Sequence, residues 1–212
     1  MSNKKKIWFI RHAQSLTNAD NNFRSEYTSA SLVPLSEFGI KQSEDLLRHF
    51  KMSPDLIIVS PYLRAKQTAK FLTDKYKDAF SEEWGIYEFT YLSQKKCVGT
   101  TFNERQIMVD AYWKNADPFY IDGDGAESFA DFFKRVCYTI DDLKLRKENF
   151  IVLFSHEYFI LAVRYLLEKG NIEMTKKEME EFRGYCVLNK IQNAKIIEIN
   201  NNLLKSIKTI IF

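Results

Sequence analysis

Cysteine is scarce in this sequence. Its 212 residues include only Cys97, Cys137 and Cys186, which are widely spaced and form no Cys-x-x-Cys pair. An even set of cysteines in a short chain would indicate a disulfide framework, and paired cysteines would indicate a zinc site. The sequence therefore predicts neither.

Long apolar runs and a large net charge are also missing. No run approaches the roughly 18 apolar residues that a membrane-spanning helix needs, and the first residues do not resemble a signal peptide. The 31 Lys and Arg residues nearly balance the 28 Asp and Glu residues, so the net charge is only +3. This excess is too small to favour nucleic acid binding. We therefore expect a cytoplasmic protein that binds neither nucleic acid nor membranes.

The apolar material that is present is enough for one core. Hydrophobic residues make up 45% of the chain and charged residues 28%, which is typical of a folded soluble protein. Three short apolar runs predict buried strands, and helical patterns lie between and after them. The expected strands are 7–10, 55–60 and 150–154, and the expected helices are 36–51, 62–77, 128–143 and 158–168.

Strands that alternate with helices are typical of a parallel sheet covered on both faces. The predicted fold class is α/β, a three-layer α/β/α domain spanning residues 1–212 with a mostly parallel central sheet. Residues 80–125 lack the alternation and are rich in aromatics, which predicts a small inserted cap. Within it, 104–114 is expected to be helical with Ile107, Ala111 and Tyr112 facing inward.

The C-terminal part of the chain gives weaker patterns. Residues 185–191 and 195–199, with a turn near Asn193, predict a β-hairpin. The tail 203–212 is apolar at intervals, and we expect it to dock on the domain.

Cationic or imidazole side chains follow each predicted strand. Arg11 and His12 come directly after the first strand, Arg64 lies a few residues beyond the second, and His156 follows the third. One Arg-His pair could simply be solvated, but parallel strands end at the same edge of a sheet, so these groups are expected to converge. Arg side chains match phosphate oxygens. Because no acidic metal-ligand cluster lies beside them, the sequence predicts a phosphate site that needs no divalent ion.

Four short motifs resemble those of a known family. They are Arg11-His12-Ala13 with Asn18, Leu35-Ser36-x-x-Gly39-x-x-Gln42, Ser60-Pro61-x-x-Arg64-Ala65-x-x-Thr68-Ala69, and Ser155-His156-Glu157. Together they resemble the histidine phosphatase superfamily, in the branch that includes the cofactor-dependent phosphoglycerate mutases. The third motif matches the family pattern in full.

The resemblance implies a covalent mechanism. His12 would attack phosphorus and form a phosphohistidine, which splits the transfer into two steps. An imidazole with an ordinary pKa of about 6.5 is largely neutral near neutrality. The resemblance further implies that three side chains hold the phosphoryl oxygens, with a hydrogen bond from Asn18 in addition. These three are Arg11, Arg64 and His156. No metal and no cofactor are expected.

The leaving alkoxide also needs a proton. In the family, a carboxylic acid from the segment after the second helix provides it, and the resemblance makes Glu88 the candidate here. Glu82, Glu83 and Glu104 remain alternatives, although Glu82 and Glu83 also fit a solvated acidic pair.

Two residues depart from the family pattern. Ala13 replaces a Gly, which should fit unless its φ must be positive. Glu157 replaces the Gly after the second His, and its carboxylate is expected to disfavour bound phosphate. Residues 21–34 do not resemble the mutase loop, which favours a phosphatase. The predicted function is therefore a metal-independent phosphomonoester hydrolase; a mutase and a non-catalytic phospho-ligand binding module are the alternatives.

The substrate is less clear from the sequence, which is compatible with a small phosphorylated molecule or a phosphoprotein and indicates no oligomeric state. Lys95 and Lys96 could meet a second anionic group of the substrate, although a solvated pair is the simpler interpretation. Glu104-Arg105 and Tyr112-Trp113 could line the pocket or pack the cap. For Glu127-Ser128, capping of the next helix is an adequate account.

Overall fold

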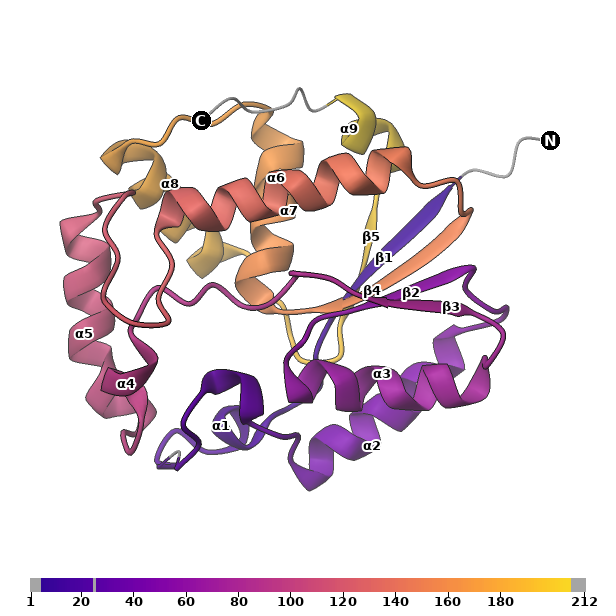
Figure 1. Cartoon of the computed structure of the whole chain (residues 1–212), viewed down its shortest axis with the longest axis horizontal. Coiled ribbons are helices and arrows are strands. Elements are labelled where there is room, and N and C mark those ends of the chain that lie inside the picture. The colour runs from indigo at the N-terminus through magenta and orange to yellow at the C-terminus, as the bar shows by residue number, and fades with distance from the viewer. Residues whose placement is uncertain (1–4, 25, 207–212) are drawn as a thin grey trace.

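A mostly parallel five-stranded sheet forms the centre of the protein (Figure 1). The structure, a computed structural model, describes residues 5–24 and 26–206. The strands are β1 (Lys6–Arg11), β2 (Leu56–Val59), β3 (Phe80–Glu83), β4 (Phe150–Ser155) and β5 (Ile196–Ile199), in the spatial order β3-β2-β4-β1-β5. Every neighbouring pair is parallel except β1 with β5. The carboxyl ends of β1, β2 and β4 therefore meet at one edge.

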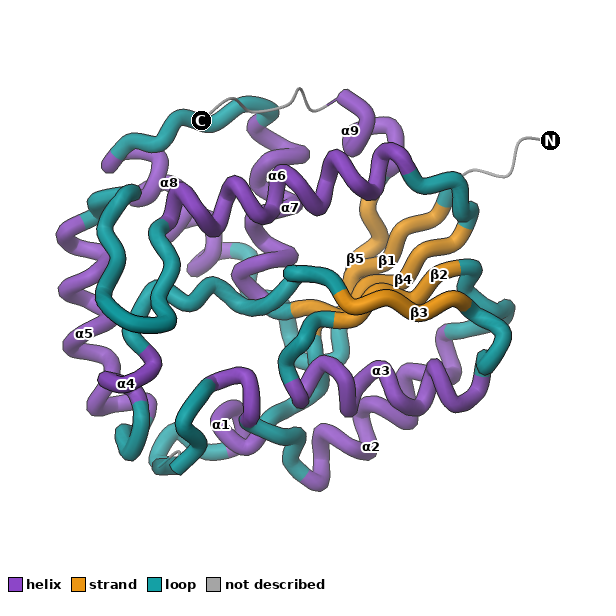
Figure 2. The backbone as a smooth tube through the Cα atoms, in the orientation of Figure 1, coloured by secondary structure: helices purple, strands orange, loops and turns teal. Residues whose placement is uncertain are grey.

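Helices cover both faces of this sheet (Figure 2). They are α1 (Leu16–Ala19), α2 (Glu37–Asp45), α3 (Leu63–Lys75), α4 (Gln94–Cys97), α5 (Phe102–Asn115), α6 (Phe129–Leu145), α7 (Glu157–Lys169), α8 (Lys176–Leu188) and α9 (Asn201–Ser206). Figure 1 shows α2 and α3 on one side of the sheet and α6 and α7 on the other. The predicted three-layer α/β/α fold is confirmed. No helix within the described residues is long and apolar enough to cross a membrane.

The two-residue period of the strands explains the layers. Phe9 and Leu153 pack toward α6 and α7, whereas Ile10 and Val152 pack toward α3 on the opposite face. Because successive side chains of a strand point to opposite faces, a strand buried on both sides reads as a continuous apolar run. All six residues of β4 are buried. This is why the central strands are visible in the sequence.

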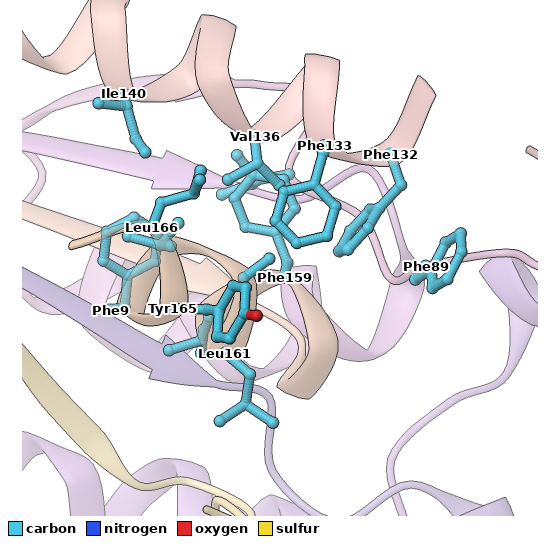
Figure 3. Packing of buried hydrophobic residues seen from close by; sticks show 14 of the residues in the cluster. Phe9, Phe89, Phe132, Phe133, Val136, Ile140, Phe159, Leu161, Tyr165 and Leu166 are labelled. Carbon is cyan, nitrogen blue, oxygen red and sulfur yellow. The ribbon is translucent and has the colours of Figure 1, made fainter. Parts of the chain in front are cut away.

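Helix α6 contributes three phenylalanines to the larger core, two of which, Phe132 and Phe133, are labelled in Figure 3. Its predicted apolar stripe is buried throughout: Phe129, Phe132, Phe133, Val136, Ile140 and Leu143. Ser128 caps this helix, since its Oγ accepts a hydrogen bond of 3.0 Å from the backbone N–H of Asp131. The stripe and its cap were both predicted, and the structure confirms them.

The start of the expected cap was wrong. Residues 80–83, which we assigned to the inserted segment, form the edge strand β3, parallel to β2. Three of its four residues are exposed, and Phe80 is 76% exposed. An edge strand with little burial carries no apolar run, so the pattern that reveals β2 and β4 is absent here.

The expected hairpin was also wrong in its first half. Residues 176–188 form helix α8, and only Ile196–Ile199 forms a strand, antiparallel to β1. Met179, Phe182 and Cys186 are buried on one face of α8, at helical spacing. Residues 201–206 form α9, whose Leu204 is buried; the remainder of the expected tail, 207–212, lies outside the described residues.

Helix α5 lies where a helix was expected, but with a different face inward. Ile107 is 78% exposed and Ala111 is also exposed, contrary to the prediction, whereas Tyr112 is buried as predicted and Trp113 is buried beside it. Figure 1 places α4 and α5 at the end of the molecule where the loop after β1 lies. This segment therefore lies on the side of the molecule where the parallel strands end.

Candidate active site

A cavity of about 220 Å³ opens at the carboxyl ends of the parallel strands. Among the residues that line it are five that the sequence singled out: Arg11, His12, Asn18, Arg64 and Glu88. His156 does not line the cavity; it is fully buried and is hydrogen bonded to Arg64, which does. The structure thus brings all six candidate residues to one place.

His12 is held as a neutral imidazole. Its Nδ1–H donates to the carbonyl oxygen of Ala13 at 2.7 Å, while Nε2 accepts a hydrogen bond of 3.0 Å from Nε–H of Arg64. Burial, with the Arg64 charge in addition, holds the pKa of His12 well below its ordinary value. The unprotonated nitrogen is therefore Nε2, on the side of the ring that faces Arg64.

His156 is neutral for the same reasons. Desolvation, followed by the charge of Arg64, holds its pKa well below the ordinary value. Its Nδ1 accepts from Nη2–H of Arg64 at 3.1 Å, so Nε2 carries the proton and donates to Ser60 Oγ at 2.8 Å. Ser60, at the end of β2, thereby sets the orientation of the imidazole toward Arg64.

Arg64 connects the two imidazoles. It is only 7% exposed, and its Nη1 donates to the carbonyl oxygen of Ala30 at 2.6 Å. Desolvation lowers the pKa of Arg64 to about 10, which still leaves it charged at neutral pH. Within the described part of the chain no carboxylate forms an ion pair with Arg64, although Glu88 interacts with it at longer range. A buried guanidinium held by neutral acceptors favours an anionic ligand.

Arg11 has a different environment. Its Nη1 lies 3.1 Å from Oε2 of Glu157 and also donates to the carbonyl oxygen of Ile191. The other carboxylate oxygen of Glu157 accepts from the backbone N–H of Ile191 at 2.9 Å. Nε of Arg11 is buried without a hydrogen-bond partner in the described part of the chain. One edge of the guanidinium is therefore tethered, and the rest is left for a ligand.

Two hydrogen bonds to its side-chain oxygen orient the amide of Asn18. Oδ1 accepts from Ser15 Oγ at 2.9 Å and from Nδ2 of Asn193 at 3.3 Å. These contacts occupy the acceptor end of the side chain. The amide nitrogen remains as the donor at the cavity wall, which suits an anionic oxygen.

Glu88 lies between β3 and α4 with one oxygen fixed. Oε1 accepts from the backbone N–H groups of Phe89 at 3.0 Å and Tyr158 at 3.1 Å. Desolvation raises the pKa of Glu88 above its ordinary value, although the Arg64 charge opposes this effect. When Glu88 is protonated, the proton is therefore on Oε2.

The alternative acids do not line this cavity. Glu82 is paired with Arg146, and Glu83 with Lys66. Glu104 is paired with Arg24 and caps α5 through Thr101.

A partly buried ion pair that the sequence analysis did not identify holds the segment around Glu88 in place. Glu127 Oε1 accepts from Arg135 Nη2 at 2.6 Å and from the Thr90 backbone N–H at 3.1 Å. Arg135 Nη1 in turn donates to the carbonyl oxygens of Gly85 and Tyr87. The sequence accounts for the pair Glu127-Ser128 by helix capping, and Ser128 alone fills that role. The signal that was available for the ion pair is an acid and a base eight residues apart on either side of the start of α6.

The motif at residues 35–42 supports the loop after β1. Gln42 Oε1 accepts from the Gln14 backbone N–H at 2.9 Å, and the Ser36 N–H donates to Gln14 O at 2.9 Å. A Cβ on Gly39 would lie 2.1 Å from Gln14 O, so only glycine fits there. Ala13 is buried and does not have a positive φ, so its replacement of Gly is accommodated.

The loop after α1 closes one side of the cavity. Tyr27 and Val33 line it, together with Ala30. Arg24 ties this loop to the segment before α5 through the carbonyl oxygen of Gly99, and to α5 itself through the carboxylate of Glu104. Across residues 5–24 and 26–206, no three His, Cys, Asp or Glu side chains are placed to hold a metal ion.

Comparison with known proteins identifies a family. The family model described as the histidine phosphatase superfamily (branch 1) matches residues 7–196. This range includes all four motifs and every candidate site residue. No curated protein sequence matches the chain.

Solved structures share the fold at low sequence identity. A mycobacterial glucosyl-3-phosphoglycerate phosphatase is 22% identical with a TM-score of 0.65, covering 92% of this chain and 89% of its own. The alpha-ribazole phosphatase of Shigella flexneri is 20% identical with a TM-score of 0.67, covering 92% and 89%. A phosphoserine phosphatase from Entamoeba histolytica, solved with 3-phosphoglyceric acid, is 22% identical with a TM-score of 0.65, covering 91% and 89%.

Proposed function

Because the chain belongs to the histidine phosphatase superfamily, we propose that it hydrolyses phosphate monoesters through a phosphorylated His12, without a metal ion. The observation that carries this proposal is the state of His12. It is neutral, its unprotonated Nε2 lies beside a buried guanidinium, and it shares a cavity with a carboxyl group of raised pKa. The three similar structures described above, all named as phosphatases, favour the same class.

In the first step, Nε2 of His12 attacks phosphorus while the bond to the ester oxygen breaks. The Nε–H of Arg64 that now donates to Nε2 turns to a phosphoryl oxygen and frees the lone pair. Arg11 and the amide of Asn18 bind the remaining oxygens, and these donors stabilise charge that develops in the transition state. His156 acts by orienting Arg64.

Glu88 balances the protons. Its Oε2 proton goes to the departing alkoxide, which leaves as the alcohol. In the second step the same carboxylate takes a proton from water as the water oxygen attacks phosphorus. The bond from phosphorus to His12 then breaks, inorganic phosphate leaves, and Glu88 is again protonated.

The size of the cavity favours a small phosphorylated substrate over a phosphoprotein. About 220 Å³ at the phosphate end, walled by the loop residues Tyr27 and Val33, accommodates a small ester. A folded protein surface would have to displace that loop.

The experiment is phosphate release from a panel of phosphomonoesters in EDTA, with His12→Ala beside the wild type. We expect EDTA-resistant release that the substitution abolishes while the circular dichroism spectrum is unchanged. Isomerised product without phosphate would identify a mutase, and tight phosphate binding without turnover would identify a binding module. Full activity in His12→Ala would exclude the proposed nucleophile.

A further inference from the structure

Beyond Glu88 the cavity continues into a second chamber with apolar walls. This chamber measures about 190 Å³ and shares Arg64, Glu88 and Arg105 with the first. Its apolar walls are formed by Phe89, Tyr91, Leu92, Cys97, Phe102 and Val109. A cavity of about 150 Å³ is enough to hold a benzene ring. The space therefore fits one ring-sized apolar group.

The chemistry of the site directs the leaving group into this chamber. Glu88 must lie within hydrogen-bond reach of the ester oxygen if it is to protonate it. Because Glu88 borders both chambers, an ester oxygen beside it has the phosphate cluster on one side and the apolar chamber on the other. The alcohol part of the substrate then lies against apolar walls.

Two cationic side chains line this chamber, Arg64 and Arg105, and Arg105 is the one that lies outside the phosphate cluster. Its Nη1 donates to the carbonyl oxygen of Thr100 at 2.8 Å and to Thr100 Oγ1 at 3.1 Å, which fixes the guanidinium. Among the described residues, no carboxylate lies within ion-pair distance of it. A half-buried guanidinium beside apolar walls is stabilised by an anionic partner, and the described residues supply none.

The neighbouring cations are already paired. Lys95 lies 2.5 Å from Asp124 and Lys96 lies 2.8 Å from Asp122. These lysines, which the sequence left open as contacts for a second anion, are thus engaged elsewhere. Neither lines the chamber.

We propose that the substrate is a phosphomonoester of an apolar, ring-sized alcohol that carries a carboxylate, and that Arg105 binds this carboxylate. Arg105 offers one guanidinium without a carboxylate partner among the described residues, which matches one negative charge, whereas the phosphate end of the site has the guanidiniums of Arg11 and Arg64. The proposal rests on the phosphatase activity proposed above and names its substrate class. Arg105, which borders both chambers, is then a specificity-determining residue through its contact with the alcohol part.

The test compares 4-carboxyphenyl phosphate with its neutral isostere, 4-carbamoylphenyl phosphate. The measured quantity is the ratio of their kcat/KM values, in the wild type and in Arg105→Gln. Differences in intrinsic leaving-group reactivity cancel when the two enzymes are compared. A charge-assisted hydrogen bond at a half-buried site predicts that the preference for the carboxylate falls roughly tenfold in Arg105→Gln.

Two further variants separate the interpretations. Arg105→Lys keeps the charge and should keep part of the preference. Lys95→Gln removes an exposed cation from the adjoining helix and should leave the ratio unchanged. An unchanged ratio in Arg105→Gln overturns the proposal, as does efficient hydrolysis of other esters with neither aryl ester accepted. Failure to hydrolyse any phosphomonoester would instead overturn the phosphatase function itself.

Discussion

The pairing of Glu157 with Arg11 predicts that this carboxylate weakens phosphate binding. Glu157→Gln removes the charge and keeps a side-chain oxygen that can accept from the backbone N–H of Ile191. Ile191 also holds Arg11 through its carbonyl oxygen, so the guanidinium stays in position. The substitution therefore changes charge more than geometry.

The magnitude follows from the contact. The Glu157 carboxylate lies 3.1 Å from Arg11 Nη1. A phosphate bound at the opposite edge of the guanidinium would lie roughly 8 Å from this carboxylate. At that distance, and at an effective dielectric constant of about 20–40, the carboxylate repels each negative charge of the phosphate by about 1–2 kcal/mol. A tenfold change in affinity corresponds to about 1.4 kcal/mol. Inorganic phosphate bound as the monoanion, with one such charge, should therefore bind Glu157→Gln roughly five- to thirtyfold more tightly than the wild type.

Isothermal titration calorimetry with inorganic phosphate measures this directly. Glu168→Gln is the matched control, because Glu168 is an exposed carboxylate on the same helix, paired with Arg164. Its affinity for phosphate should equal that of the wild type. Unchanged or weaker binding in Glu157→Gln would refute the reasoning, since the carboxylate would then support phosphate through the tether instead of opposing it through charge.

Three other predictions concern the acid, its brace and the loop. The lowered pKa of His12 and the raised pKa of Glu88 confine activity to a range in which the first is neutral and the second protonated. Rates should fall as pH drops through the His12 pKa and as it rises through the Glu88 pKa, and Glu88→Gln should lose the alkaline limb of the pH–rate profile. Glu127→Gln, which weakens the brace, should lower kcat about tenfold or more for alkyl esters but little for 4-nitrophenyl phosphate, whose leaving group needs no acid; equal losses for both would contradict the brace. Gly39→Ala should cost about 1–3 kcal/mol or more through overpacking against Gln14, lowering the melting temperature in calorimetry by several degrees; an unchanged melting temperature would contradict it.

The central sheet was predictable because its strands are buried on both faces. The runs at 7–10, 55–60 and 150–154 correspond to β1, β2 and β4, whose parallel pairing follows from the helices between them. Strand β3 was not predictable in this way, since an exposed edge strand has no apolar run. Helix α8 was missed although Met179, Phe182 and Cys186 have helical spacing, because the shorter run at 185–191 resembled a strand.

Part of the site was predictable from the strand ends, and Asn18 and Glu88, which also line the cavity, were expected there from the family resemblance. Arg11, His12 and His156 follow parallel strands directly, so the topology alone brings them near one another. The pairing of Glu157 with Arg11 depends on Ile191, which lies on a loop far along the chain. Such contacts are set by tertiary packing, and no local pattern in the sequence carries them. The brace formed by Glu127 and Arg135 belongs to the same class.

The most direct test of the account is the intact mass of the protein during turnover. The protein is mixed with a substrate that it hydrolyses, denatured within milliseconds at alkaline pH, where phosphohistidine survives, and analysed by mass spectrometry. We expect a species heavier by one phosphoryl group, with the modification on His12 and absent from His12→Ala. Rapid hydrolysis with no phosphorylated protein at any quench time, or a phosphoryl group on another residue, would contradict the proposed mechanism.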